Sequence, residues 1–119
     1  MKVKAREASG YVLLTPSDDI TFQTCHPFRS QMDKALEMFP APWVVIDLSH
    51  VSFINSSGVG VMVEMLRRLR RRGGGLCLIN VHEQLRRLLE KTKLDRDLLI
   101  ADDEASLADI MARGDISSS

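Results

Sequence analysis

The chain has 119 residues, the size of one ordinary domain, and its 45% hydrophobic and 27% charged residues are typical of a globular protein. Its 16 Lys and Arg balance its 16 Asp and Glu, so net charge gives no attraction to nucleic acid or to a membrane surface. No run approaches the roughly 18 apolar residues of a membrane helix, and the N-terminus lacks the apolar stretch of a signal peptide. We therefore expect one cytoplasmic domain over residues 1–114 and a polar tail over 115–119.

A hairpin is predicted at the start of the chain. Val3, Ala5 and Glu7 alternate with Lys4 and Arg6, which predicts a short edge strand. Ser9-Gly10 is a turn signal, and residues 11–14 read as the second strand. The polar stretch 15–24, which contains Pro16, is predicted to be a loop.

A helix and a buried strand come next. The apolar face of the helix consists of Phe28, Met32, Ala35, Leu36 and Phe39. Pro27 suits the first turn of that helix, and Pro40 and Pro42 end it. Residues 43–48 form an apolar run with β-branched side chains, which predicts a central strand buried on both faces.

The second half of the chain continues the alternation of strands and helices. Residues 59–72 keep helical spacing, and Gly73-Gly74-Gly75 ends that helix. The later elements are a buried strand over 76–79, a helix around 85–89 and a short strand over 98–100. Leu107, Ile110 and Met111 mark a closing helix, and Asp102 or Asp103 is expected to cap it. The order ββαβαβαβα predicts a single α/β domain with a mixed, mostly parallel sheet.

The distinctive segment is DLSHVSFINSSGVG at residues 47–60. Here a buried strand runs into a polar turn, and the turn opens a helix. A helix N-terminus carries unpaired N–H groups and a partial positive charge, so a phosphate on a hydroxyl there is tolerated locally. It would add about two negative charges to a surface that binds a partner, which predicts a binding switch. Gly58 and Gly60 would let another backbone approach. The residues alone also fit a simple helix cap.

The pattern DLSHVSFINSSGVGVM resembles the signature of the STAS domain family, and within it the anti-sigma factor antagonists. The resemblance covers about residues 43–112 and is specific at 47–60. It implies a STAS-like fold in which Ser56 is the phosphorylated serine, with Ser57 as the second candidate. The partner-binding residues that it implies are Asn55, Ser56, Ser57, Gly58, Val59, Gly60 and Asp19.

The resemblance also implies a cycle. The unphosphorylated protein binds an anti-sigma factor that is a serine kinase of the histidine-kinase-like ATPase fold, and this binding frees the sigma factor. The kinase phosphorylates Ser56, the complex dissociates, and a PP2C-type serine phosphatase resets the protein. The domain itself is expected to be a monomer when free, to need no metal or cofactor, and to be no enzyme.

Two segments depart from the family pattern. Asn55 stands where the family usually has aspartate, and an asparagine cannot accept a proton as a base. The 15–24 loop fills the usual Gly-x-Leu-Asp pattern only loosely. Asn55 motivates the alternative function, a non-switching STAS adaptor in a stress-sensing assembly or a transporter system.

Other candidate sites have simpler interpretations. The basic helix end is made of Arg67, Arg68, Arg70, Arg71 and Arg72. It is read as a solvated face that complements the helix dipole rather than as a nucleic-acid footprint. Cys25, His26, Cys77 and His82 lack zinc-ligand spacing, the two cysteines are not expected to pair, and His50 is expected at the surface. Ser56 lacks the glycine of a nucleophile elbow, and no Lys-Ser/Thr pair follows Gly75 to make a phosphate loop.

Overall fold

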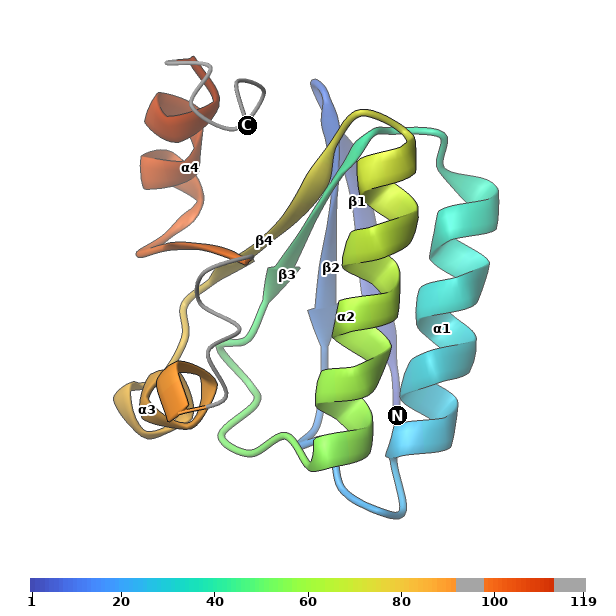
Figure 1. Cartoon of the computed structure of the whole chain (residues 1–119), viewed down its shortest axis with the longest axis vertical. Coiled ribbons are helices and arrows are strands. Elements are labelled where there is room, and N and C mark those ends of the chain that lie inside the picture. Colours follow the sequence, from blue (N-terminus) through green and yellow to red (C-terminus); the bar gives the residue numbers. More distant parts are fainter. Residues whose placement is uncertain (92–97, 113–119) are drawn as a thin grey trace.

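The computed structural model describes residues 1–91 and 98–112, and it is built around a five-stranded sheet (Figure 1). The strands are β1 (Val3–Ala8), β2 (Tyr11–Pro16), β3 (Trp43–Asp47), β4 (Gly75–Ile79) and β5 (Leu99–Ala101). They lie in chain order across the sheet, with β1 antiparallel to β2 and every other neighbouring pair parallel. The predicted hairpin and the mixed, mostly parallel sheet are confirmed.

The described residues include four helices. They are α1 (Cys25–Met38), α2 (Ser56–Arg71), α3 (Glu83–Lys91) and α4 (Glu104–Ala112). In Figure 1, α1 and α2 lie side by side on one face, and α4 lies across the opposite face. The element order ββαβαβαβα is confirmed, and so is the single α/β domain.

The core has two parts, one on each face of the sheet. The larger part joins α1 and α2 to the sheet and includes Phe28, Met32, Met62 and Leu69. The smaller part contains Leu13, Val45, Cys77, Ile79, Ala101 and Leu107. Because β3 lies between them, its successive residues are buried on opposite faces, as predicted: Val44 is 1% exposed and Val45 0%.

Two boundaries differ from the prediction for local reasons. The helix expected from residue 59 begins at Ser56, because the side chain of Asn55 caps it. The strand expected over 11–14 continues to Pro16, which pairs with Val3 at the end of the edge strand. A proline is tolerated at such a position since it removes only one terminal hydrogen bond. Predicted helix residues 110 and 111 lie in α4, but nothing is described of their side chains.

The C-terminal end of α2 is closed by backbone geometry. Gly73 adopts a left-handed φ of 82°, and its N–H donates to the carbonyl of Arg70 at 3.0 Å. The N–H of Gly74 donates to the carbonyl of Leu69 at 3.0 Å, which completes a Schellman motif. A Cβ on Gly74 would lie 1.8 Å from the carbonyl oxygen of Pro42. The predicted glycine stop is confirmed, and it also packs against the start of β3.

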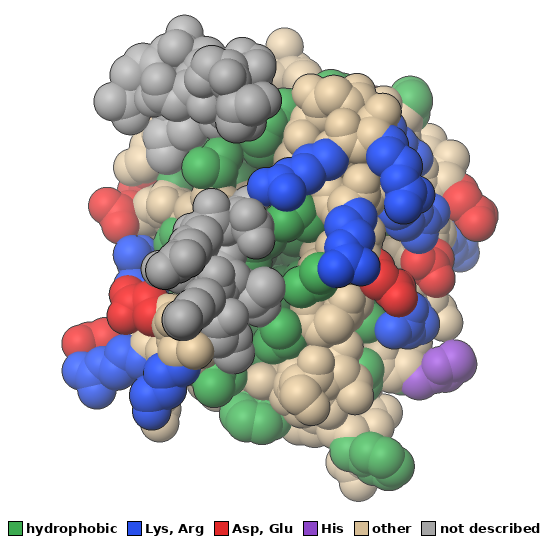
Figure 2. All heavy atoms as spheres, viewed as in Figure 1, with side chains coloured by type: hydrophobic (Ala, Val, Ile, Leu, Met, Phe, Trp, Pro, Cys, Tyr) green, Lys and Arg blue, Asp and Glu red, His purple; other side chains and the backbone are tan. Residues whose placement is uncertain are grey.

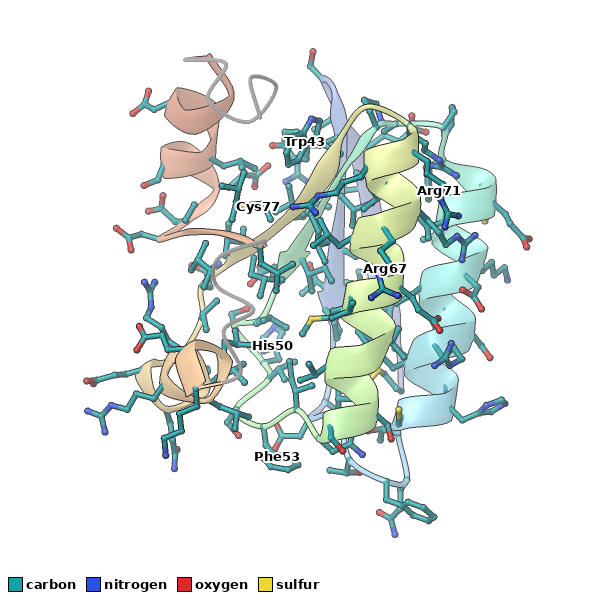
Figure 3. All side chains as sticks on the ribbon, viewed as in Figure 1. Trp43, His50, Phe53, Arg67, Arg71 and Cys77 are labelled. Carbon is teal, nitrogen blue, oxygen red and sulfur yellow. The ribbon has the colours of Figure 1, made fainter. Side chains whose placement is uncertain are left out.

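Two arginines of the basic run hold α2 against α1. The guanidinium of Arg72 donates to the carbonyl of Phe39 at 3.0 Å, just past the end of α1, and Arg68 pairs with Asp33 of α1 at 2.9 Å. Arg72 is exposed and Arg68 half-buried, so the interpretation as a solvated face omitted only that α1 and the residue after it supply acceptors for these two side chains. Arg67 and Arg71 are exposed, and Figure 3 shows them projecting outward from α2.

Among the described residues, none of the helices combines the length and apolar character needed to cross a bilayer. Residues 113–114 of the predicted domain and the predicted tail over 115–119 lie outside the described residues.

Candidate functional site

Ser56 occupies the first position of α2, at the end of the molecule where the chain returns from β3 (Figure 1). Both Ser56 and Ser57 are exposed. Asn55 before them has extended backbone, and its Oδ1 accepts the N–H of Gly58 at 2.7 Å. The cap uses the donor of Gly58, so the N–H groups of Ser56 and Ser57 stay at the open helix end. The predicted hydroxyl at a helix N-terminus is present.

A second loop is bonded to this segment. Ile20 and Ile54 form a short parallel bridge, and both side chains are buried. The N–H of Ile20 donates to the carbonyl of Phe53 at 2.9 Å, and the N–H of Asn55 donates to the carbonyl of Ile20 at 2.8 Å. The prediction of a plain loop over 15–24 was therefore wrong at Ile20. The pairing joins residues that are 34 positions apart in the sequence, so no local pattern could reveal it.

Asp19 is brought to the segment by the same pairing. Its Oδ1 accepts the N–H of Ser52 at 2.7 Å, and both carboxylate oxygens lie 3.1 Å from the Ser52 hydroxyl. The carboxylate thus fixes the turn that leads to Ser56. The bonds to Ser52 show that Asp19 has a structural role, and its role in partner binding stays a prediction.

The two glycines of the motif have different surroundings. A Cβ on Gly58 would lie 2.6 Å from Cγ2 of Ile20 and 2.8 Å from Cγ2 of Ile54, so the missing side chain allows internal packing. A Cβ on Gly60 would have no neighbour within 4 Å, and Gly60 is exposed. Only Gly60 is thus open to the approach of another backbone. Val59 between them is half-buried against the core.

The motif begins at Asp47, which anchors the chain at the end of β3. Its Oδ1 accepts the N–H of Ser49 at 2.9 Å and the side-chain amide of Asn80 at 3.0 Å. Burial by itself would raise the pKa of the Asp47 carboxyl, but the hydrogen bonds from Asn80 and Ser49 outweigh it and lower that pKa. Asn80 follows β4 in a left-handed conformation with φ of 55°. Asp47 therefore ties the start of the segment to the neighbouring strand.

Sequence reasoning missed two exposed aromatic side chains, one on the turn before Ser56 and one on the loop bonded to that turn. Phe22 is 93% exposed, and Phe53 is 49% exposed. Figure 3 shows Phe53 at the turn that leads into α2. The only signal for Phe22 was a large aromatic residue within a polar stretch that was predicted to be a loop. Its exposure depends on how that stretch packs.

The residues considered for zinc are not brought together. Cys25 packs against the core beneath α1, whereas Cys77 is buried in the core on the opposite face, and both are free thiols (Figure 3). Burial raises the pKa of Cys77 to about 11. His82 contacts the carbonyl of Ser49 through Nε2 at 3.0 Å, and His50 is exposed as predicted. Among residues 1–91 and 98–112, no group of three or more His, Cys, Asp and Glu side chains could hold a metal ion.

Comparisons with known proteins agree on the family. The model of the STAS domain matches residues 2–107. An anti-sigma F factor antagonist of Paenibacillus polymyxa is 24% identical over 106 residues, which cover 89% of this chain and 91% of that protein. A putative anti-sigma factor antagonist of Thermotoga maritima is 29% identical over 91 residues, covering 76% of this chain and 80% of that protein.

Solved structures share the fold. The crystal structure of a putative anti-sigma factor antagonist from Thermotoga maritima superposes with a TM-score of 0.83 at 24% identity, covering 93% of this chain and 95% of that one. The structure of the anti-sigma factor antagonist SpoIIAA in its unphosphorylated form superposes with a TM-score of 0.75 at 17% identity. The match covers 93% of this chain and 97% of that one. The murine anion transporter Slc26a9 gives 0.75 at 17% identity, but the match covers 92% of this chain and only 19% of the transporter. The chain belongs to the STAS domain family, and the curated relatives cited here are regulators named as anti-sigma factor antagonists.

Proposed function

We propose that this protein is an anti-sigma factor antagonist that works as a phosphoswitch at Ser56. Unphosphorylated, it binds an anti-sigma factor that is a serine kinase of the histidine-kinase-like ATPase fold. Phosphorylation of Ser56 releases that kinase, and a PP2C-type phosphatase restores the free hydroxyl. The cycle uses cellular ATP and therefore places the protein in the cytoplasm. The observation that carries the proposal is an exposed Ser56 at the first position of α2, inside the motif that matches the family.

The placement of Ser56 favours a change in binding over a change in fold. Its side chain is exposed, so a phosphate displaces no core residue. The N–H groups of the first turn and the helix dipole favour negative charge at that position. The turn before Ser56 is held by Asn55, Asp19 and Asp47 through bonds that do not use the Ser56 hydroxyl. About two added negative charges would therefore act mainly on the docked partner.

Asn55 bears on the chemistry of phosphoryl transfer. Its amide oxygen is occupied as the cap of Gly58, and an amide cannot take the proton of the serine hydroxyl. In this proposal the kinase supplies the base. An Asn55→Asp variant keeps the cap acceptor and adds a carboxylate beside Ser56, so we expect its phosphorylation to be faster than that of the wild type.

A second candidate function is a non-switching STAS adaptor within a larger assembly or a transporter system. Asn55 favours it, because a domain that is not phosphorylated has no need of a carboxylate at that position. The protein itself catalyses nothing in either function. The adaptor would bind its assembly equally well with and without a charge at position 56.

The decisive experiment is a pull-down from native lysate with three baits: wild type, Ser56→Asp and Ser57→Asp. Ser57→Asp tests the second candidate serine, since it adds the same charge at the neighbouring exposed position. We expect wild type to recover an ATPase-fold kinase, Ser56→Asp to lose it, and incubation of the recovered kinase with ATP to phosphorylate Ser56. Equal recovery of a transporter subunit or large assembly by wild type and Ser56→Asp would replace the phosphoswitch with the adaptor function.

A further inference from the structure

Three large hydrophobic side chains are exposed among the described residues, and two of them lie on the segment that leads to Ser56 or on the loop bonded to it. They are Phe22 at 93%, Phe53 at 49%, and Met38 at 62%, which ends α1. A single exposed apolar residue needs no explanation. Phe22 and Phe53 differ from Met38 because their segments are joined by the hydrogen bond from Ile20 to Phe53, and neither ring belongs to the core.

The two rings are carried on backbone that is fixed by hydrogen bonds. The carbonyl of Phe53 accepts the N–H of Ile20 at 2.9 Å, two residues before Phe22. Beyond that bond, the Thr24 hydroxyl donates to the carbonyl of Asp19 at 2.6 Å and accepts the N–H of Thr21 at 2.8 Å. The loop that carries Phe22 is therefore locked at both ends. A loop whose backbone is already fixed loses less conformational entropy when its side chains are buried by a partner.

Phe53 lies beside the residue that a kinase must reach, and Phe22 lies on the loop that is bonded to the same turn. Phe53 precedes Ser56 by three residues, and Figure 3 shows it next to the N-terminal end of α2. Figure 2 shows hydrophobic side chains at this lower end of the molecule, away from the Lys and Arg side chains that gather over α2 higher up. The surface around Ser56 thus combines a polar hydroxyl position with apolar flanks, and large aromatic residues of this kind commonly dominate the energy of protein interfaces.

We propose that Phe22 and Phe53 are the apolar anchors by which the anti-sigma factor kinase holds this protein, and that the kinase presents apolar pockets beside the site that receives Ser56. This inference rests on the proposed function and adds the chemistry of the partner surface. The anchors hold the protein while phosphorylation decides its release, so binding and switching belong to neighbouring but separate groups.

A second copy of the chain is a poorer occupant for this surface. A stable interface usually buries about 800 Å² on each partner, and one phenylalanine supplies at most about 150–250 Å². A symmetric pair formed through these two rings would also cover Ser56 and close it to a kinase. A kinase has to contact Ser56 and its surroundings in any case, so the rings extend a contact that the proposed function already requires.

The test uses purified protein and the purified kinase that wild type recovers in the pull-down. Binding affinity is measured by calorimetry for wild type, Phe22→Ala, Phe53→Ala and Ser56→Asp. Met38→Ala is the matched control, since it truncates an exposed apolar residue at the opposite end of α1. We expect Phe22→Ala to weaken binding by at least about tenfold, as interface anchors do, and Met38→Ala to change it by less than about twofold.

Two further readouts separate anchoring from folding and from chemistry. Phe22 is almost fully exposed, so Phe22→Ala should melt at the wild-type temperature, whereas the half-buried Phe53 can lose some stability. With ATP, Phe22→Ala should raise the KM of the protein as a kinase substrate by at least about tenfold and leave kcat within about twofold, because the ring binds and does not react.

The outcomes are distinct. If Phe22→Ala binds the kinase with wild-type affinity and Ser56→Asp does not bind it, the proposal that Phe22 and Phe53 anchor the kinase is wrong. The proposed phosphoswitch at Ser56 is then still supported. Failure of wild type to recover any kinase overturns the proposed function and this inference with it. If wild type is a dimer in solution and Phe22→Ala makes it monomeric, the occupant is a second copy of the chain. If wild type binds phosphatidylglycerol vesicles and Phe22→Ala abolishes that binding, the occupant is a lipid surface. Either result would overturn the proposal.

Discussion

The two ends of α2 are used in opposite ways. At the C-terminal end, Gly74 abuts the carbonyl of Pro42, and Arg68 and Arg72 bond to α1. At the N-terminal end, Ser56 and Gly60 are exposed, and a Cβ on Gly60 would meet nothing within 4 Å. One end of the helix is committed to contacts within the molecule, and the other presents groups to solvent.

This difference explains how a small domain can carry a modifiable site without losing stability. Each contact at the C-terminal end fixes the position of α2 on the sheet. The exposed N-terminal end can then accept a charge or a partner while the fold remains. Substitutions at the C-terminal end should therefore change the free energy of unfolding, and substitutions at the exposed positions near Ser56 should change binding.

The largest expected effect comes from a pair of glycines, one at each end. Gly74→Ala would place a Cβ 1.8 Å from a backbone oxygen, so the turn has to move, and we expect a loss of about 3 kcal/mol or more. Gly60→Ala meets nothing and lies inside a helix, so it should stabilise the protein by about 0.5–1 kcal/mol. Urea unfolding followed by circular dichroism measures both.

Equal unfolding free energies for the two glycine variants would contradict the contrast between the ends of α2. The same two variants also test the contrast between the ends of α2 by their binding to the kinase. Gly60→Ala is expected to unfold later than wild type and yet to bind the kinase more weakly, if its open surface belongs to the interface.

An intermediate effect is expected at Arg72. Arg72→Met keeps an aliphatic side chain but removes the hydrogen bonds to the carbonyls of Leu36 in α1 and of Phe39 and Ala41 after it. Because the site is exposed, the loss should be about 1 kcal/mol, or a fall in melting temperature of about 4 °C. Arg67→Met is the matched control on the exposed side of the same helix and should melt within about 1 °C of wild type. A similar melting temperature for both variants would remove the structural role assigned to Arg72.

The smallest effect concerns pH and Asp47. The hydrogen bonds from Asn80 and Ser49 lower the pKa of this carboxyl in the folded state, so its contribution is present above the ordinary aspartate pKa of about 3.9. That contribution is lost as the pH falls through the lower, folded-state value. Asp47→Asn cannot titrate, so its stability should decline less than that of wild type below about pH 4. Parallel acid profiles for the two proteins in thermal melts would show that these hydrogen bonds do not stabilise the charged form.

Much of the fold could be predicted because its signals are local. The helical spacing from Phe28 to Phe39 and the apolar run from Trp43 reflect side chains that pack in the core, whereas residues 4–7 of the edge strand are exposed. Asp103 was one of two predicted caps for α4, and its Oδ1 accepts the N–H of Ser106 at 2.8 Å. The strand predicted over 98–100 lies one residue later, at Leu99–Ala101, because its pairing with β4 sets its limits.

The candidate site could be predicted only in part. The motif at 47–60 identified Ser56 and the helix N-terminus, since a capping pattern is encoded by neighbouring residues. The motif could not predict that Gly58 faces the interior or that two phenyl rings are exposed. Their surroundings come from Ile20 and its loop, which belongs to a different part of the chain.

The sequence by itself thus determined the order of strands and helices, the glycine stop after α2 and the serine at its start, because each depends on a few adjacent residues. Only the tertiary structure decided that Gly58 serves packing, that Arg72 belongs to the end of α1, and that the loop of Phe22 is bonded to the turn before Ser56. These features arise where segments some 30 residues apart meet, and contacts over that separation depend on how the whole chain packs.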